Sequence, residues 1–180
     1  MKRALIIHGF GSNSREHWFQ EEKVTLEKMG YQVTVPDMPH ASEPVKEEWL
    51  EVVRKFKPSE SDILIGHSLG APTILRYLEE AENKVGKVFL LSAFAEDLNP
   101  FSEDKHTFDD INNFIVDTPF DWNKIKKNCD EFYVIHETND PYVPKECGMR
   151  VAQNLSGNLV LCEGDCHFDK LDLTLINDSL

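Results

Sequence analysis

A serine flanked by two glycines is the feature of this sequence best suited to catalysis: Gly66-His67-Ser68-Leu69-Gly70. The pattern G-x-S-x-G is typical of a nucleophilic serine on a sharp turn between a strand and a helix. The apolar run Asp62–Ile65 precedes this motif, and a helical pattern over Ala71–Glu82 follows it. The glycines are needed because side chains at their positions would collide with the neighbouring strand or helix. The spacing therefore predicts Ser68 as a nucleophile, and the alternative is an ordinary turn with a capping serine.

A serine hydroxyl needs a base to accept its proton, and that base needs a carboxylate to orient it. In hydrolases with this motif, the three groups follow the chain order serine, acid, histidine. We expect His167 to be the base, because it lies in the loop after the last apolar run, Asn158–Cys162. The other histidines are interpreted differently. His17 and His40 precede the motif but could line a pocket, and His67 lies inside the motif, pointing away from the side of Ser68. His106, in an acidic loop, and His136, at a strand end, are interpreted as structural or solvated.

The candidate acid is Asp140, in the turn after the penultimate apolar run, Glu131–His136. Pro141 and Pro144 stiffen this turn and would fix the direction of the carboxylate. Some hydrolases place the acid one strand earlier, which here would be Asp97. That residue lacks rigid flanks, so the sequence favours Asp140.

Two backbone N–H groups are needed to stabilise the oxyanion that forms when a carbonyl is attacked. One should be that of Leu69, directly after the nucleophile. The other should come from the loop His8-Gly9-Phe10-Gly11-Ser12, with the N–H of Phe10 as the candidate. The alternative is a glycine-rich connection without a catalytic role. These groups together predict cleavage of a small ester or amide through an acyl-enzyme, with no metal or organic cofactor. Cys162 and Cys166 lack the second pair of cysteines or histidines expected of a zinc site.

The elements that must position these residues alternate along the chain, which is typical of a parallel sheet with helices on both faces. Short apolar runs predict strands at Arg3–His8, Gln32–Pro36, Asp62–Gly66, Lys87–Leu91, Glu131–His136 and Asn158–Cys162. Helices are predicted at Glu16–Met29, Ala71–Glu82, Asp121–Asn128, Lys145–Leu155 and from Phe168 onward. A further helix is predicted from its cap Ser42, with Pro44 in the first turn, to Phe56. Because reactive residues collect at the carboxyl ends of parallel strands, we expect a minimal α/β-hydrolase fold of about six strands. Residues 1–180 are expected to form a single domain.

Composition narrows the partners. The formal net charge of −13 would repel nucleic-acid phosphates and anionic lipid headgroups, so neither is an expected partner. The N-terminus has only four apolar residues before His8, too few for a secretory signal, and no apolar run approaches the roughly 18 residues needed to cross a membrane. We therefore expect a cytoplasmic protein with reduced cysteines.

The segment Ala95–Phe120 occupies the usual position of a lid. It is too short for a large cap, and Phe94, Phe101, Phe108, Phe114 and Phe120 lie in or beside it. We expect a small, open pocket with an aromatic wall, which favours a short ester or amide over long-chain lipids. The alternative is that these phenylalanines only pack the segment onto the core.

Several segments together resemble the YdeN-like small serine hydrolases, the family of the retinoblastoma-binding serine hydrolase in the α/β-hydrolase superfamily. They are His17-Trp18-Phe19, Asp37-Met38-Pro39, Gly66–Gly70, Leu91–Ala95, Asp121–Lys126, Asn139-Asp140-Pro141 and His167-Phe168. The resemblance implies a catalytic triad of Ser68, Asp140 and His167. Cys166 stands where the family usually has glycine. No Leu-x-Cys-x-Glu segment is present, so a retinoblastoma-type partner is not expected.

Three classes of function fit these observations. An active serine hydrolase is favoured, whether esterase, amidase or peptidase. The alternatives are a catalytically weak hydrolase fold that binds a protein and an acyltransferase that uses an acceptor other than water. The sequence leaves the oligomeric state open.

Overall fold

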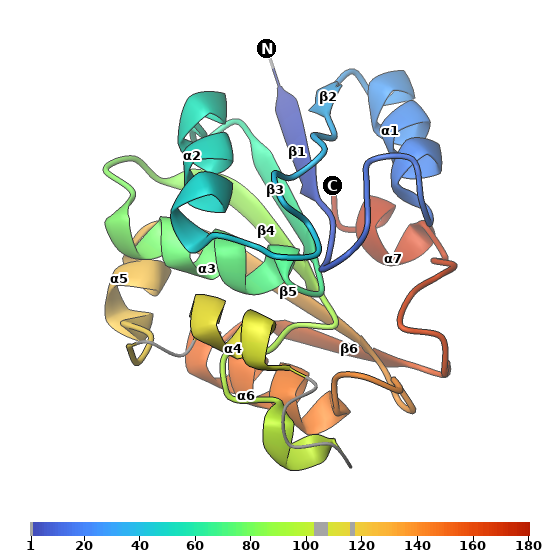
Figure 1. Cartoon of the computed structure of the whole chain (residues 1–180). Coiled ribbons are helices and arrows are strands. Elements are labelled where there is room, and N and C mark those ends of the chain that lie inside the picture. Colours follow the sequence, from blue (N-terminus) through green and yellow to red (C-terminus); the bar gives the residue numbers. More distant parts are fainter. Residues whose placement is uncertain (1, 103–107, 116–117) are drawn as a thin grey trace.

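The computed structural model describes residues 2–102, 108–115 and 118–180, without the side chains of 113–115. Its centre is a six-stranded sheet in the order β2-β1-β3-β4-β5-β6, in which every neighbouring pair is parallel (Figure 1). The strands are β1 (Arg3–Ile7), β2 (Gln32–Thr34), β3 (Ile63–His67), β4 (Val85–Leu91), β5 (Cys129–Glu137) and β6 (Asn158–Cys162). The predicted parallel sheet of about six strands is confirmed.

Continuous apolar strands form the middle of the sheet because both of its faces are covered. All five residues of β3 are buried, and four of the five in β1 are. The edge strand β6 is only partly buried. The chain runs from β1 to β2 on one side, whereas it runs from β3, on the other side of β1, to β4. The loops that follow β1 and β3 therefore diverge at the carboxyl edge. A crevice for a ligand forms at such a point in parallel sheets.

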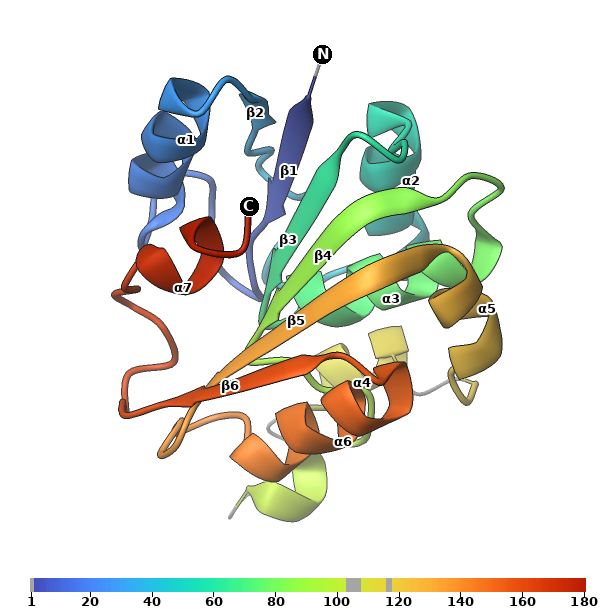
Figure 2. The ribbon, with the colours of Figure 1, turned by 180° about the vertical axis from the view of Figure 1, so that it is seen from behind.

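Helices cover the two faces unequally (Figures 1 and 2). One face packs on α2 (Lys46–Phe56), α3 (Gly70–Glu80), α5 (Trp122–Lys127) and α6 (Lys145–Leu155), with core side chains such as Trp49, Leu75 and Val151. The other packs on α1 (Phe19–Lys28) and the short α7 (Thr174–Asn177), around Phe19, Phe168 and Ile176. No helix among the described residues is long and apolar enough to cross a membrane.

Three predicted helix starts need correction. The second helix begins at Lys46, beyond the predicted cap Ser42, because Val45 is still extended. The first helix begins at Phe19 rather than Glu16. The last one begins at Thr174 rather than Phe168, because His167 and Phe168 both have a φ of 55°, in the left-handed region, where a right-handed helix cannot continue. The segment Ala95–Phe120 contains a 3₁₀ turn at Asn99–Phe101 and α4 (Asp109–Ile115). The candidate His106 and the side chain of Phe114 lie outside the described part of the chain.

Candidate active site

Ser68 follows β3 directly and has a φ of 53°. Its N–H donates to the carbonyl of Leu91, 2.9 Å away, at the end of the neighbouring strand β4. A methyl group on Gly66 would lie 2.6 Å from the carbonyl oxygen of Gly70, and one on Gly70 would overlap the carbonyl of Ile7. The two glycines are therefore required by close backbone approach. This strained turn lifts Ser68 above the carboxyl edge of the sheet, at the N-terminus of α3.

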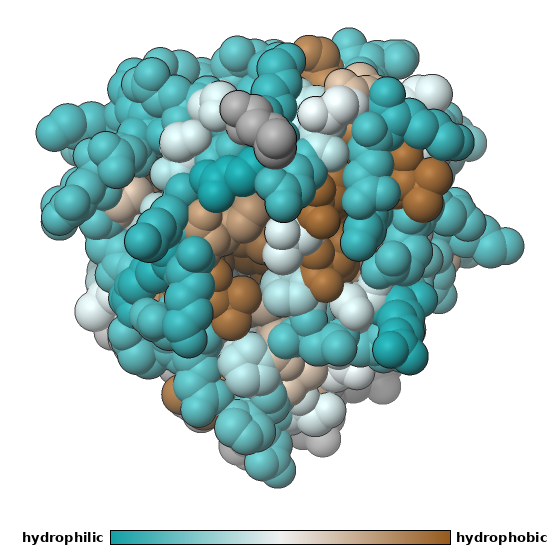
Figure 3. Space-filling view, turned by 90° about the horizontal axis from the view of Figure 1, so that it is seen from above, coloured by the Kyte–Doolittle hydropathy of each residue, from teal (hydrophilic) through white to brown (hydrophobic). Residues whose placement is uncertain are grey.

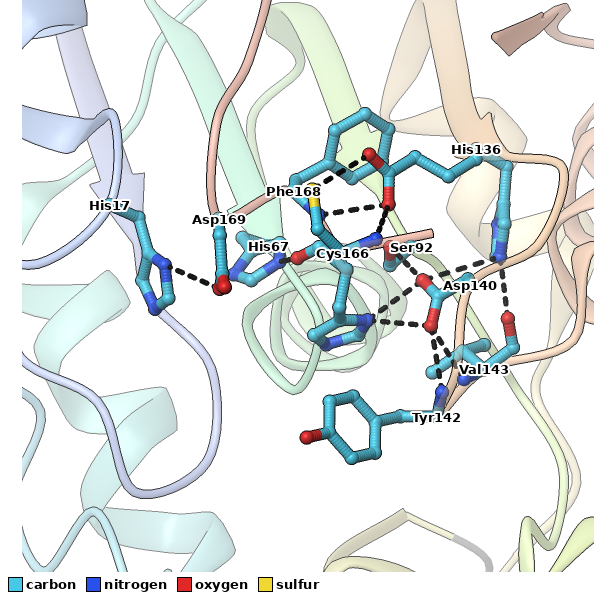
Figure 4. Close-up of polar contacts among 12 residues, drawn as sticks. His17, His67, Ser92, His136, Asp140, Tyr142, Val143, Cys166, Phe168 and Asp169 are labelled. Atoms are coloured by element: carbon cyan, nitrogen blue, oxygen red, sulfur yellow. Dashed lines mark hydrogen bonds and ion pairs between the residues drawn. The ribbon is translucent and has the colours of Figure 1, made fainter. Parts of the chain in front are cut away.

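Asp140 and His167 lie against each other, from the loops that follow β5 and β6. The Nδ1 of His167 is 2.7 Å from Oδ2 and 2.9 Å from Oδ1 of Asp140 (Figure 4). A carboxylate only accepts hydrogen bonds, so Nδ1 has the proton and Nε2 is left free to accept one. His167 and Ser68 both line the same cavity. No hydrogen bond joins them among the described contacts, and in empty sites this bond is often formed only when substrate is bound.

The carboxylate of Asp140 is fully buried and accepts hydrogen bonds from three further donors. Ser92 Oγ donates to Oδ2 at 2.6 Å, and the N–H groups of Tyr142 and Val143 donate to Oδ1 at 2.9 Å (Figure 4). Burial alone would raise the pKa of Asp140. The hydrogen bond and charge of His167, followed by the bonds from Ser92 and Val143, outweigh burial and lower that pKa to about 2. Asp140 is thus an anion at neutral pH, as an orienting carboxylate must be.

Asp97, the alternative acid, lies in different surroundings. Its Oδ1 accepts from the N–H of Asn99 at 2.8 Å and from the side-chain amide of Asn112 at 2.5 Å. Both partners belong to the segment after β4. Asp97 therefore holds that segment together, and the structure brings Asp140, not Asp97, to His167.

Two other histidines form hydrogen bonds that hold the loops of the site in place. His67 Nε2 donates to the carbonyl of His167 at 2.9 Å, so the serine turn holds the backbone of the histidine loop. His136 Nε2 donates to the carbonyl of Val143 at 2.9 Å and lies 3.8 Å from Asp140 Oδ2. Burial lowers the pKa of both imidazoles, so they are neutral donors. The burial of His136 agrees with a structural role and excludes a solvated one.

The loop after β1 lies close against Ser68. A methyl group on Gly9 would lie 2.8 Å from Ser68 Cβ, so only glycine fits there. His8 fixes the loop: its Nδ1 donates to the Gly9 carbonyl at 2.8 Å, and its Nε2 accepts from the N–H of Met38 at 2.9 Å. Phe10 follows and lines the cavity with Ser68. In the described part of the chain, the backbone N–H groups of Phe10 and Leu69 have no hydrogen-bond acceptor.

A cavity of about 400 Å³ opens above Ser68 and His167. Its wall is largely apolar and is lined by Phe10, Phe94, Leu98, Phe108, Ile111, Tyr142 and Val143. His17 and Asp169 form its polar side, with His17 Nδ1 3.2 Å from Asp169 Oδ1 (Figure 4). His40 instead contacts Glu48 on the surface, 2.7 Å away. Of the two early histidines, His17 is therefore the one that the structure places at the cavity.

The opposite end of the sheet lacks comparable chemistry. Figure 3 shows the end at which β1 begins: the surface is largely hydrophilic, with separate apolar patches around a hollow. A cavity of about 370 Å³ near the start of β1 is lined by residues that include Arg3 and Phe56. Arg3 is already paired with Asp62, at 2.5 Å. No cluster of three or more potential metal ligands occurs within residues 2–102, 108–115 and 118–180.

Comparison with known proteins agrees with this geometry. The profile of the family described as Serine hydrolase matches residues 4–172. The chain belongs to this family. The protein YdeN of Bacillus subtilis (strain 168) is 31% identical over 171 residues, 93% of this chain and 86% of YdeN. The serine hydrolase RBBP9 of Rattus norvegicus is 28% identical over 174 residues, 94% of this chain and 89% of RBBP9.

Solved structures give the same assignment of fold. The crystal structure of the B. subtilis ydeN gene product has a TM-score of 0.89 at 29% identity, covering 99% of this chain and 97% of that one. Est1E from Butyrivibrio proteoclasticus has a TM-score of 0.73 at 19% identity, covering 99% and 84%. The chain is thus a YdeN-like serine hydrolase with an α/β-hydrolase fold, as the resemblance implied.

Sequence reasoning missed Ser92 as a partner of Asp140. It lies at the end of β4 with a φ of 47° and is completely buried. The signal that was present is its position directly after an apolar run, at the same edge of the sheet as Ser68. Cys166, next to His167 in the sequence, is not among the residues that line the cavity. Its thiol donates to Glu137 Oε1 instead, at 3.3 Å.

Proposed function

We propose that this hydrolase cleaves a short carboxylic ester through an acyl-enzyme formed on Ser68. The observation that supports this most is that Ser68 and the bonded pair His167–Asp140 meet at one cavity with an apolar wall. Each group comes from a different loop at the carboxyl edge of the sheet. A convergence of nucleophile, base and orienting acid is the arrangement that serine hydrolases require.

In the proposed mechanism His167 Nε2 takes the proton of Ser68 Oγ as that oxygen attacks the ester carbonyl. The oxyanion is stabilised by the N–H groups of Leu69 and Phe10. Asp140 keeps His167 in the required tautomer and stabilises the imidazolium. His167 then gives its proton to the departing alcohol, and the acyl group stays on Ser68. Water, deprotonated by His167, attacks the acyl group and releases the carboxylic acid, which regenerates Ser68.

The size and polarity of the cavity suggest which esters fit. A volume of about 400 Å³ suits a small acyl group, and Phe94, Leu98 and Phe108 offer it apolar contacts. The pair His17–Asp169 lies on the polar side, where the alcohol part of the ester would leave toward solvent. We therefore place short apolar or aromatic acyl groups above long-chain lipids.

Labelling with a fluorophosphonate probe tests the proposal, because such probes react only with an activated serine. The wild type should be labelled within minutes and Ser68→Ala should not be labelled. A series of p-nitrophenyl acetate, butyrate and octanoate should give the highest kcat/KM for the short esters. Wild-type labelling no faster than that of Ser68→Ala would contradict catalysis and favour a binding role for the fold. Faster ester consumption with an added alcohol, together with a new ester product, would indicate an acyltransferase.

A further inference from the structure

A buried glutamate that the mechanism does not use lies beneath the histidine loop. Glu137 is the last residue of β5, three positions before Asp140, and its exposed fraction is 4%. Its Oε2 accepts from the N–H of Cys166 at 3.0 Å and from the N–H of Phe168 at 3.2 Å (Figure 4). Its Oε1 accepts from the Cys166 thiol at 3.3 Å. The carboxylate thus binds the residues on both sides of His167.

The histidine loop needs such external support. His167 and Phe168 both lie in the left-handed region, at a φ of 55°, where a residue other than glycine costs about 1–2 kcal/mol. β6 ends at Cys162 and α7 begins at Thr174, so no regular element fixes the loop between them. Hydrogen bonds to a carboxylate are about twice as strong as those between neutral groups. The hydrogen bonds to Glu137 can therefore offset the backbone strain at His167 and Phe168, which no strand or helix holds in place.

The same contact joins the loop of the base to the loop of the acid. The N–H of Thr138 donates to the carbonyl of Cys162 at 2.9 Å, and the N–H of Asn139 donates to that of Gly164 at 3.0 Å. A methyl group on Gly164 would overlap the Glu137 carboxylate, so a larger residue there would displace the carboxylate from this position. The hydrogen bonds of Glu137 add to these two backbone bonds and reach the residues that flank His167.

Cys166 fits this arrangement as the partner of Glu137. Its backbone N–H and its thiol both point to the carboxylate, and its side chain lies away from the cavity.

We propose that Glu137 is a positioning residue that, with Cys166, holds His167 at the right distance and angle to Asp140 and Ser68. The proposal rests on the proposed function, because its effect is exerted through His167. Glu137 does not line the cavity, so its loss should lower kcat and leave KM nearly unchanged. A misplacement of about 1 Å of a catalytic group can lower the rate on the order of 100-fold.

Four variants test this, with p-nitrophenyl acetate as the probe. Glu137→Ala removes both acceptor oxygens and should lower kcat by at least 30-fold with KM within twofold of wild type. Glu137→Gln keeps one oxygen for the two N–H groups and should stay within about fivefold of wild type. Glu137→Asp keeps the charge but is one methylene too short to reach the loop, so we expect at least a tenfold loss. Glu163→Ala, on the same loop but exposed, is the matched control and should match the wild type.

The downfield proton resonance of the His167–Asp140 bond supplies a second readout. It should be sharp in the wild type and in Glu137→Gln, and shifted or broadened in Glu137→Asp. If Glu137→Ala does not fold, Glu137→Asp decides: wild-type kcat and an unchanged resonance in that variant would overturn the proposal. A rise in KM with constant kcat would also overturn it. A wild type without Ser68-dependent turnover would instead contradict the proposed function itself, so the two failures can be told apart.

Discussion

An asparagine at position 140 would keep the shape of the Asp140 side chain while removing its charge and one acceptor. The N–H groups of Tyr142 and Val143 lie 2.9 Å from Oδ1, so the amide oxygen would take that position. The amide NH₂ would then replace Oδ2, which is 2.7 Å from His167 Nδ1. Facing a donor, Nδ1 loses its proton to Nε2, and His167 can no longer accept the proton of Ser68.

We therefore expect Asp140→Asn to lower kcat by about 10⁴-fold, equivalent to roughly 5 kcal/mol of transition-state stabilisation. KM should change little, because Asp140 is fully buried and is not among the residues that line the cavity. Initial rates with p-nitrophenyl acetate at pH 8 measure both constants, and circular dichroism shows whether the variant is folded. Asp97→Asn is the control and should keep at least a third of the wild-type kcat. A loss below tenfold for Asp140→Asn, or an equal loss for Asp97→Asn, would show that Asp140 does not orient His167.

Three further variants probe the support of the site and the fold. Ser92→Ala removes one charged hydrogen bond from Asp140 and should lower kcat about tenfold; steady-state kinetics with an unchanged kcat would contradict this role. Gly66→Ala places a methyl group 2.6 Å from the Gly70 carbonyl oxygen and should cost about 2 kcal/mol of stability, so an unchanged urea midpoint would be inconsistent with the close approach. Burial raises the pKa of Glu22 from 4.5 to about 7, although the hydrogen bond from Asn177 lowers it. Because the folded state holds this proton more tightly, the free energy of unfolding should fall by up to about 3 kcal/mol as pH rises from 4.5 to 7. Glu22→Gln should not show this fall and should be more stable than wild type at pH 8. Urea unfolding at pH 4.5 and pH 8 measures this; the same difference in unfolding free energy between variant and wild type at both pH values would argue against it.

The parts of the fold that sequence could predict are those set by short-range pattern. Continuous apolar runs identified the strands, because a parallel sheet covered on both faces has no polar alternation. The carboxyl edge of that sheet then grouped Ser68, Asp140 and His167 from their positions after three strands. The stiff flanks Pro141 and Pro144 favour Asp140 over Asp97, and the structure places Asp140 beside His167.

What sequence could not predict depends on contacts between distant positions. Ser92 reads as an ordinary strand-end serine until the fold brings it within 2.6 Å of Asp140, 48 positions away. Glu137 is one of 32 acidic residues, and nothing local marks it as buried beneath the loop of His167. The last helix was placed too early for a similar reason: the left-handed φ of His167 and Phe168 is imposed by tertiary hydrogen bonds, which helical propensity does not reflect.

Trapping the acyl-enzyme tests the central claim most directly. Wild-type protein is mixed with p-nitrophenyl acetate, quenched in acid within the first turnover, digested and analysed by mass spectrometry. We expect one acetyl group, on the peptide that contains Ser68. Its amount should rise in a burst, and it should be absent from Ser68→Ala and His167→Ala. An adduct on any other residue, or an unmodified Ser68 during measurable turnover, would contradict it.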